Sequence, residues 1–272
     1  MIPFPKTTVW IGSAALLFFV MAASTNATAS AMATSSASQQ PTPNTDQQHS
    51  PSLTQSETQS AKLWNRFAQS YAQSPIADQV SYETKLAMTR KYLTTSTTRV
   101  LEFGCGTGGT ALLHAPYVKQ YDAIDISSRM IDTARAKQTS STTDTSHVHF
   151  RVQGLHSLPV PTKDSSLLYN VVLGLSILHL MPHRVQAIRK VHQLLKPGGM
   201  FISSTPCIGD MPGVSLLVKF LGPPLAWLGV IPHVHVFTKA TLRRDLEQNG
   251  FAIQEEFHPG QGKGVFLIAK KI

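Results

Sequence analysis

The sequence predicts an α/β domain built on a doubly wound, mostly parallel sheet. Three observations lead to this prediction. Strand-like and helix-like segments alternate from residue 99 to the C-terminus, a glycine-rich turn joins the first strand to a helix, and residues 167–173 are apolar at nearly every position. Alternation of strand and helix is typical of a parallel sheet with helices on both faces, and strands covered on both faces are apolar throughout.

The periodicity of the apolar residues places the individual elements. The first helix, for example, has Leu63, Trp64, Phe67 and Tyr71 at helical spacing. The last two strands are joined by a short connection, which predicts an antiparallel hairpin. Strands are expected at residues 99–103, 121–126, 148–153, 167–173, 200–204, 251–257 and 265–270. Helices are expected at residues 61–72, 78–92, 109–115, 127 or 128 to 137, 183–195 and 239–248.

The N-terminal region has a different character. Residues 9–23 are apolar with Lys6 before them and small residues after them, which is the layout of a secretory signal peptide. The run is shorter than the roughly 20 apolar residues that span a bilayer. Residues 24–60 are rich in Ser, Thr, Gln, Ala and Pro and lack the apolar residues that fold a chain. We therefore predict a signal-like or anchor segment at 1–23, a disordered linker at 24–60 and the folded domain at 61–272, with an apolar, lid-like insertion at about 211–237.

Charge and cysteine content limit the partners that the domain can have. Setting aside Lys6, Asp46 and Glu57 leaves 23 Lys and Arg against 13 Asp and Glu after residue 60, a surplus of +10. Such a surplus favours an anionic partner such as an acidic membrane, but the basic residues are scattered, which argues against nucleic acid. Cys105 and Cys207 are expected at the ends of strands with one strand between them, about 9–10 Å apart, and therefore unpaired.

The most informative stretch is residues 100–109, VLEFGCGTGG. A strand that runs into glycines and then a helix places them at the carboxyl edge of the sheet, where α/β proteins bind ligands. Glycine lets the backbone approach a ligand, and the start of a helix presents unpaired N–H groups. Asp125 ends the second strand about twenty residues later, where a carboxylate can accept hydrogen bonds from ribose hydroxyls. The pattern predicts an adenosine-containing cofactor.

Two classes of cofactor fit this loop. Gly104, Gly106 and Gly109 satisfy the G-x-G-x-x-G pattern of dinucleotide-binding proteins. Glu102 favours a ligand that carries an ammonium and a sulfonium group, because a carboxylate before the glycines is unfavourable beside a pyrophosphate. A tight turn that binds nothing is the third alternative.

Residues 102–108 resemble motif I of the class I S-adenosylmethionine-dependent methyltransferases, in the small-molecule branch that includes the ubiquinone/menaquinone-biosynthesis type. The resemblance extends over most of residues 64–272. It implies a Rossmann-like sheet of seven strands with a reversed final hairpin. It also implies S-adenosylmethionine as the cofactor and a small molecule as the methyl acceptor, with a hydrophobic compound as one alternative. Further residues that carry it are Asp125-Ile126-Ser127, Leu158-Pro159, Ile177-Leu178-His179, Lys196-Pro197-Gly198-Gly199 and Gly250-Phe251.

The resemblance also implies roles for individual residues. The methionine end of the cofactor would lie against Glu102, Gly104, Cys105, Gly106 and Gly108, the ribose against Asp125, and the adenine against Ile126, Met130, Gly154 and Leu155.

Two departures from the family pattern bear on cofactor binding. Family members often carry an acid after the glycine that ends the third strand. Leu155 stands there, so a contact to the adenine amino group has to come from the backbone or from elsewhere. Tyr169-Asn170 replaces the usual Phe-Asp of the fourth strand. Because of these two departures, a protein that binds the cofactor without catalysing a reaction remains an alternative.

Methyl transfer is an in-line displacement, so positioning supplies much of the acceleration, and a base is needed only where the acceptor loses a proton. His179, after the fourth strand, is the candidate base, and Tyr71 is a candidate to close over the cofactor. Ordinary hydrogen bonding and packing explain both residues equally well. The pairs His147/His149 and His233/His235 lack a further ligand cluster, so no metal site is predicted.

Two rivals to a methyltransferase remain. One is an NAD(P)-dependent oxidoreductase, and the other is a non-catalytic, membrane-tethered protein that binds S-adenosylmethionine. Because this cofactor is held in the cytoplasm, the N-terminal segment has three interpretations. It anchors a cytoplasmic domain, it is an export signal, or translation starts later, at Met21 or Met32. A cytoplasmic domain, with or without the anchor, is favoured over export.

Overall fold

The structure, a computed structural model, describes residues 53–95, 98–161, 164–260 and 263–272. The predicted signal or anchor segment and most of the predicted linker lie outside the described residues. Within the described ranges, no helix is long and apolar enough to cross a membrane.

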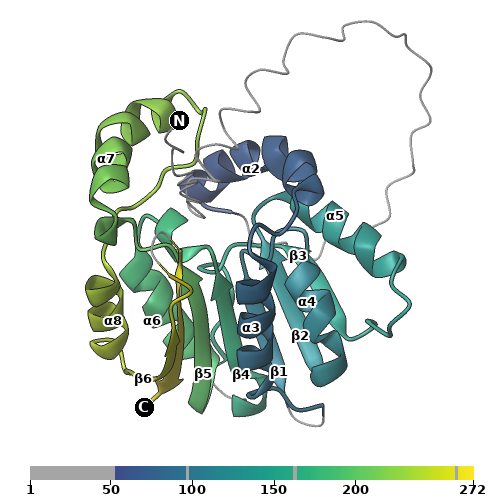
Figure 1. The fold of residues 1–272 in the computed structure, drawn as a ribbon. Helices are drawn as coiled ribbons and strands as arrows, with labels where there is room; N and C mark the ends of the chain where they lie inside the picture. The colour runs from purple at the N-terminus through teal and green to yellow at the C-terminus, as the bar shows by residue number, and fades with distance from the viewer. Residues whose placement is uncertain (1–52, 96–97, 162–163, 261–262) are drawn as a thin grey trace, which may run out of the picture.

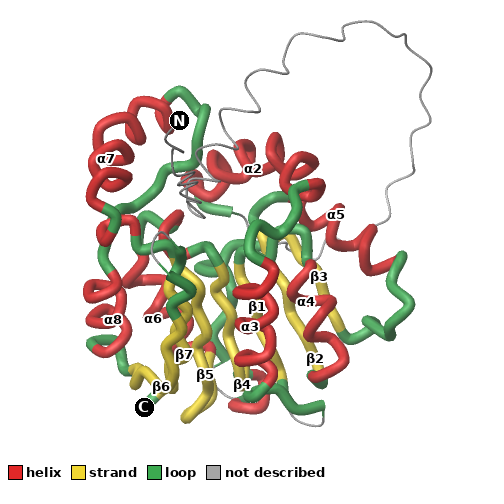
Figure 2. Tube along the Cα trace, viewed as in Figure 1, coloured by secondary structure: helices red, strands yellow, loops and turns green. Residues whose placement is uncertain are grey.

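Seven strands form one sheet in the order β3-β2-β1-β4-β5-β7-β6 (Figures 1 and 2). Strands β1 to β5 are parallel, and β7 runs antiparallel to both β5 and β6. The predicted fold class is confirmed. The order of the strands reverses between β1 and β4, which is the switch point where open α/β sheets bind ligands. The strands are β1 Arg99–Phe103, β2 Gln120–Asp125, β3 Val148–Val152, β4 Tyr169–Leu175, β5 Leu195–Thr205, β6 Phe251–Phe257 and β7 Val265–Lys271.

Apolar residues on both faces of the central strands hold the sheet between two layers of helices. Along β1, Leu101 and Phe103 pack on the face covered by α6 and α8, and Val100 packs on the face covered by α4 and α5. Successive side chains of a strand point to opposite faces, so an uninterrupted apolar run is what such a strand requires. The helices are α2 Gln55–Gln73, α3 Gln79–Arg90, α4 Gly109–His114, α5 Ser128–Thr139, α6 Arg184–Leu194, α7 Pro212–Trp227 and α8 Lys239–Glu247.

Helix α2 crosses one end of the sheet beside α5, and α7 lies at the same end (Figure 1). The helix begins at Gln55, so residues 55–60 are helical and not part of the linker that the sequence predicts. The reason is a capping box: Thr54 Oγ1 accepts from Glu57 N at 3.2 Å, and Glu57 Oε2 accepts from Thr54 N at 2.9 Å. The first turn is polar, so its composition resembles that of a linker.

Candidate functional site

The glycine loop between β1 and α4 owes its shape to three residues in the left-handed region. The φ angles are +66° at Gly104, +54° at Gly106 and +74° at Gly108. A Cβ atom on Gly108 would lie 2.7 Å from Ala134 Cβ, whereas a Cβ on Gly106 would meet only the ring of Tyr71, at 3.7 Å. Gly108 therefore serves close packing within the core, whereas Gly106 lies where the loop faces the ring of Tyr71.

Asp125, at the end of β2, ties the glycine loop to the neighbouring strand. Its Oδ2 accepts from Gly106 N at 3.0 Å, and its Oδ1 accepts from Ser127 N at 2.8 Å. Burial raises the pKa of Asp125, and the backbone hydrogen bonds from Ser127, Gly106 and Ile126 oppose that shift. An ionised carboxylate only accepts hydrogen bonds and has further lone pairs, so Asp125 suits a ligand with two neighbouring hydroxyls.

Glu102 lies one strand away, beneath the glycine loop. It is only 3% exposed, and its Oε2 accepts from the hydroxyl of Tyr121 at 2.8 Å. Burial raises the pKa of Glu102 to about 7, the hydrogen bond from Tyr121 lowers it, and the charge of Asp125 raises it. None of the residues that the structure describes places a cationic side chain on Glu102. A buried acid of this kind is costly when ionised, so a ligand ammonium group would complement it.

This pKa predicts that cofactor affinity depends on pH. A bound ammonium group favours the carboxylate, so S-adenosylhomocysteine should bind roughly ten-fold more tightly at pH 8 than at pH 6 and release a proton. In the free protein, where no ammonium group is bound, ionisation of Glu102 lowers the stability of the fold, so the raised pKa of Glu102 gives stability a pH dependence opposite to that of binding. Its contribution to stability is present below pH 4.5 and is lost as the pH rises through about 7. Calorimetric titrations in buffers of different ionisation enthalpy measure both the affinity and the proton release. Glu102→Gln should bind weakly with no such pH dependence, and an unchanged pH profile in that variant would contradict the assignment.

The structure brings Tyr71 to this site. Tyr71 is on α2, and its pKa is raised first by burial of its hydroxyl and then by the charges of Asp125 and Glu102, although 46% of the residue is exposed. The ring lies against Gly106 and therefore closes the open side of the glycine loop. Its role in catalysis stays a prediction.

His179 lies in a short 3₁₀ helix, η3 (Leu178–Leu180), that follows β4. The residue is 3% exposed, and its Nδ1 has no hydrogen-bond partner among the described residues. Burial, and secondly the charge of His235, lowers the pKa of His179 to about 4. The ring is therefore neutral above pH 5 and can accept a hydrogen bond. Its predicted role as a base is not tested by this geometry.

The predicted adenine-binding residues have different surroundings. Ile126 is half-buried after β2, and Met130 is buried in α5. Gly154 follows β3 at the carboxyl edge. The side chain of Leu155 is 3% exposed and packs in the apolar core with Leu101 and Phe103, so only its backbone is available to a ligand. The predicted role of Leu155 in binding the adenine, limited to its backbone, stays a prediction.

The structure also shows the surroundings of Cys105 and Asn170. Cys105 is a buried free thiol whose pKa is raised by burial, so a role in binding would come from its backbone. Asn170 lies near the start of β4, at the end of the sheet opposite the glycine loop, where its Oδ1 accepts from Arg99 N at 2.9 Å. The departure at Asn170 is therefore remote from the proposed cofactor site.

Sequence reasoning missed the polar residues of α2. Asn65 Oδ1 accepts from Ser127 Oγ at 2.7 Å and from Arg129 N at 3.2 Å, and so joins α2 to the start of α5. Glu57 lies against Gly154. The available signals were the Thr54-x-x-Glu57 capping-box pattern and the helical spacing that puts Glu57, Asn65 and Tyr71 along one side.

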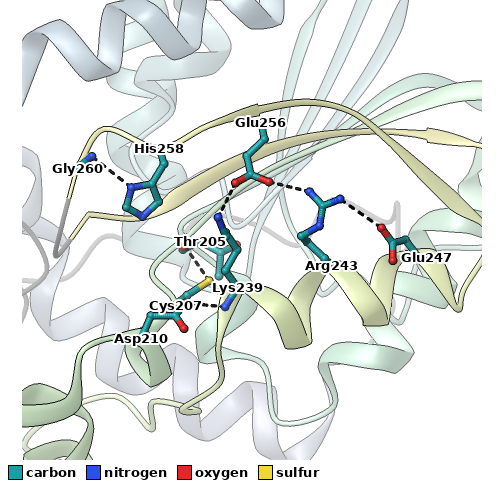
Figure 3. Close-up of polar contacts among 9 residues, drawn as sticks. All are labelled: Thr205, Cys207, Asp210, Lys239, Arg243, Glu247, Glu256, His258 and Gly260. Carbon is teal, nitrogen blue, oxygen red and sulfur yellow. Dashed lines mark hydrogen bonds and ion pairs between the residues drawn. The ribbon is translucent and has the colours of Figure 1, made fainter.

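Polar residues after β5 shape a loop (Figure 3). Asp210 Oδ2 accepts from Lys239 N at 2.7 Å, and Cys207 Sγ donates weakly to Thr205 O at 3.6 Å. Lys239 Nζ in turn pairs with Glu256 Oε1 at 2.8 Å. His233 and His235 stack with ring centroids 4.8 Å apart. Nowhere in the described ranges do three or more His, Cys, Asp or Glu residues gather in a way that could hold a metal ion.

Comparison with known proteins gives a consistent result. A family described as a methyltransferase domain matches residues 60–256. The chain is 28% identical over 157 residues to a ubiquinone/menaquinone biosynthesis C-methyltransferase of Rubrivivax gelatinosus, which is 56% of this chain and 59% of that protein. It is 32% identical over 107 residues to a ubiquinone biosynthesis O-methyltransferase of Xanthomonas campestris, or 39% of this chain and 42% of that protein. The chain thus spans less than two thirds of the length of these curated relatives.

Solved structures share the fold at low identity. Magnesium protoporphyrin IX methyltransferase from Synechocystis PCC 6803, with bound S-adenosylhomocysteine, has a TM-score of 0.60 and 19% identity, covering 79% of this chain and 99% of that one. A [4+2]-cyclase has a TM-score of 0.61 and 16% identity, covering 79% and 96%. At such identities the likeness shows the fold alone.

Proposed function

Because this chain belongs to the methyltransferase-domain family, within the class I S-adenosylmethionine-dependent methyltransferases, we propose that it transfers the methyl group of S-adenosylmethionine to a small, apolar acceptor. The family and the cofactor predicted from the sequence are confirmed, and the NAD(P)-dependent alternative is set aside. One observation carries the proposal: Glu102 and Asp125, on adjacent strands, flank a glycine loop whose middle residue, Gly106, has only the ring of Tyr71 beside its Cβ position.

Each part of the cofactor has a complement at this edge of the sheet. Glu102 suits the ammonium group, the carboxylate of Asp125 suits the two ribose hydroxyls, and Gly106 gives the backbone room to approach. S-adenosylmethionine supplies a methyl group already activated by the sulfonium. The protein then has to orient the acceptor and exclude water. Tyr71 would close the loop side, and neutral His179 would orient an acceptor hydroxyl or enol by accepting its hydrogen bond.

The exposed face of α7 supports an apolar acceptor. Leu216, Phe220 and Trp227 are 59%, 72% and 85% exposed, and Leu228, directly after the helix, is 62% exposed. Lys219 is the only Lys or Arg between residues 211 and 237. Exposed apolar patches of this kind mark contact with apolar ligands or membranes. Arg66 of α2 donates to the carbonyl of Gly229 at 2.7 Å, so the turn after α7 is tied to the helix that covers the cofactor edge. Together with the basic surplus of the domain, this face suits an anionic membrane surface that holds the acceptor.

Titration of the full-length chain with S-adenosylmethionine, S-adenosylhomocysteine and NAD tests the proposed cofactor. Micromolar affinity for the first two, about 8 kcal/mol, without binding of NAD is expected. Radiolabelled S-adenosylmethionine with an apolar quinone extract then tests transfer. Labelled product supports the proposal, whereas binding without transfer to any apolar extract supports the non-catalytic alternative. If neither S-adenosylmethionine nor S-adenosylhomocysteine binds, the proposal is overturned.

The face of α7 yields a separate prediction. The double variant Phe220→Ser/Trp227→Ser should lower binding to phosphatidylglycerol vesicles roughly ten-fold or more, because burial of one large apolar side chain contributes about 1.5–3 kcal/mol. Its affinity for S-adenosylhomocysteine should not change. Co-sedimentation with vesicles measures the effect. Val80→Ser is the matched control, since Val80 is 76% exposed on α3, and equal losses in both variants would refute a membrane role for α7.

A further inference from the structure

The carboxylate of Glu57 occupies the space where a side chain on Gly154 would lie. A Cβ atom built on Gly154 would be 2.1 Å from Glu57 Oε1 and 2.8 Å from Oε2. The two residues are almost a hundred positions apart in the sequence. Helix α2 therefore delivers an acid to the end of β3 from outside the sheet.

This acid is next to the strand that carries Asp125. Gln153 N, one residue before Gly154, donates to the carbonyl of Asp125 at 2.9 Å, so the ends of β2 and β3 are joined. Along α2, Glu57 contacts the end of β3, Asn65 contacts Ser127 after β2, and Tyr71 faces the glycine loop after β1. One helix thus covers three adjacent strand ends (Figure 1).

The two oxygens of Glu57 have different environments. Oε2 accepts from Thr54 N at 2.9 Å and from Thr54 Oγ1 at 3.0 Å, which completes the helix cap. Oε1, the atom nearest to Gly154, has no hydrogen bond within the described part of the chain. The residue is half-buried. A carboxylate can only accept, so Oε1 is suited to a donor on a ligand that lies along β2 and β3.

We propose that Glu57 binds the exocyclic amino group of the adenine of S-adenosylmethionine. The proposal rests on the proposed function, which places the ribose at Asp125 and the base beyond it toward β3. The base has one exocyclic group that donates, its amino group, and its other edge atoms are acceptors. Leu155 cannot supply the acceptor from its side chain, because leucine has no acceptor atom there, and the side chain packs in the core.

An exchange of the carboxylate between the two positions tests the placement. Glu57→Ala should weaken binding of S-adenosylhomocysteine about ten-fold or more, as expected for loss of a hydrogen bond to a charged group. Gly154→Asp alone should also weaken it, because the new side chain would meet the carboxylate of Glu57. The double variant Glu57→Ala/Gly154→Asp should return to within about three-fold of the wild type. Gly154 is not among the glycines with positive φ, so aspartate fits its backbone. Failure of the double variant to recover any affinity, with its fold intact by circular dichroism, would overturn the proposal.

An inosine analogue tests recognition of the amino group directly. In S-inosylhomocysteine a carbonyl oxygen replaces the amino group and would repel the carboxylate. The wild type should prefer S-adenosylhomocysteine at least ten-fold, and Glu57→Gln should lose most of that preference, because its amide can also donate. Thr54→Ala, which removes the cap hydroxyl but keeps Glu57, should retain the preference. An equal preference in Glu57→Gln and the wild type would overturn the role of Glu57 alone. Absence of binding of either ligand to the wild type would overturn the proposed function as well.

Discussion

Replacing Asp125 by alanine should weaken binding of S-adenosylhomocysteine by at least about 100-fold. Two losses combine in this variant. The ribose hydroxyls lose a charged acceptor, and hydrogen bonds to charged groups contribute about 1.5–3 kcal/mol each. The glycine loop also loses its tie to β2, because Gly106 N and Ser127 N both donate to this carboxylate, at 3.0 and 2.8 Å. The loop that should be preorganised for the ligand is then free to move.

Calorimetric titration measures this effect, and a thermal melt of the free protein separates binding from folding. Asp125→Asn should fall between the wild type and alanine, because the amide keeps one oxygen but presents N–H groups to a backbone donor. Asp122→Asn is the matched control. Asp122 lies on the same strand, but its Oδ2 accepts from the Tyr169 hydroxyl at 2.9 Å, and its ion-pair partners among the described residues are Arg99 and Arg151. Asp122→Asn should lower the free energy of unfolding and leave the affinity for S-adenosylhomocysteine nearly unchanged. An Asp125→Ala variant that binds within three-fold of the wild type would remove Asp125 from the site.

Replacing Gly108 by alanine should lower the free energy of unfolding by about 2–5 kcal/mol. The φ angle of +74° costs a residue with a Cβ atom roughly 1–2 kcal/mol. The new Cβ would also lie 2.7 Å from both Ala134 Cβ and Phe150 Cε1. Overpacking of a dense core typically costs about 1–3 kcal/mol more. For a domain of marginal stability, that is a large fraction of the total.

Alanine variants of two neighbouring glycines separate backbone strain from overpacking. Urea unfolding measures the free energy of unfolding of each variant. Gly109 has nothing within 4 Å of its Cβ position and is not among the residues with positive φ, so Gly109→Ala should be neutral or stabilise the first turn of α4. Gly106 has a φ of +54° but only the Tyr71 ring near its Cβ position, so Gly106→Ala should show the backbone strain with little overpacking. Equal effects at all three positions would contradict this account.

Much of the fold could be predicted because its signals are local. The alternation of strands and helices, the glycine turn and the C-terminal hairpin each depend on residues close together in the sequence. The predicted strands 99–103 and 251–257 agree with the observed bounds. The placement of Glu102 and Asp125 at one edge followed from topology, because parallel strands end together at their carboxyl ends.

The sequence by itself therefore determined the sheet, the family and the strand ends where we propose that the cofactor binds. The tertiary structure decided which side chains are available there. The side chain of Leu155 lies in the core, and Asn170 lies at the end of the sheet opposite the glycine loop. His179 is buried, which lowers its pKa to about 4. The tertiary structure also brought Glu57 onto Gly154. Such contacts join segments far apart in the chain, and their energies come from packing and desolvation at the contact itself. The pattern of apolar residues within one segment therefore cannot predict which distant segment it will contact.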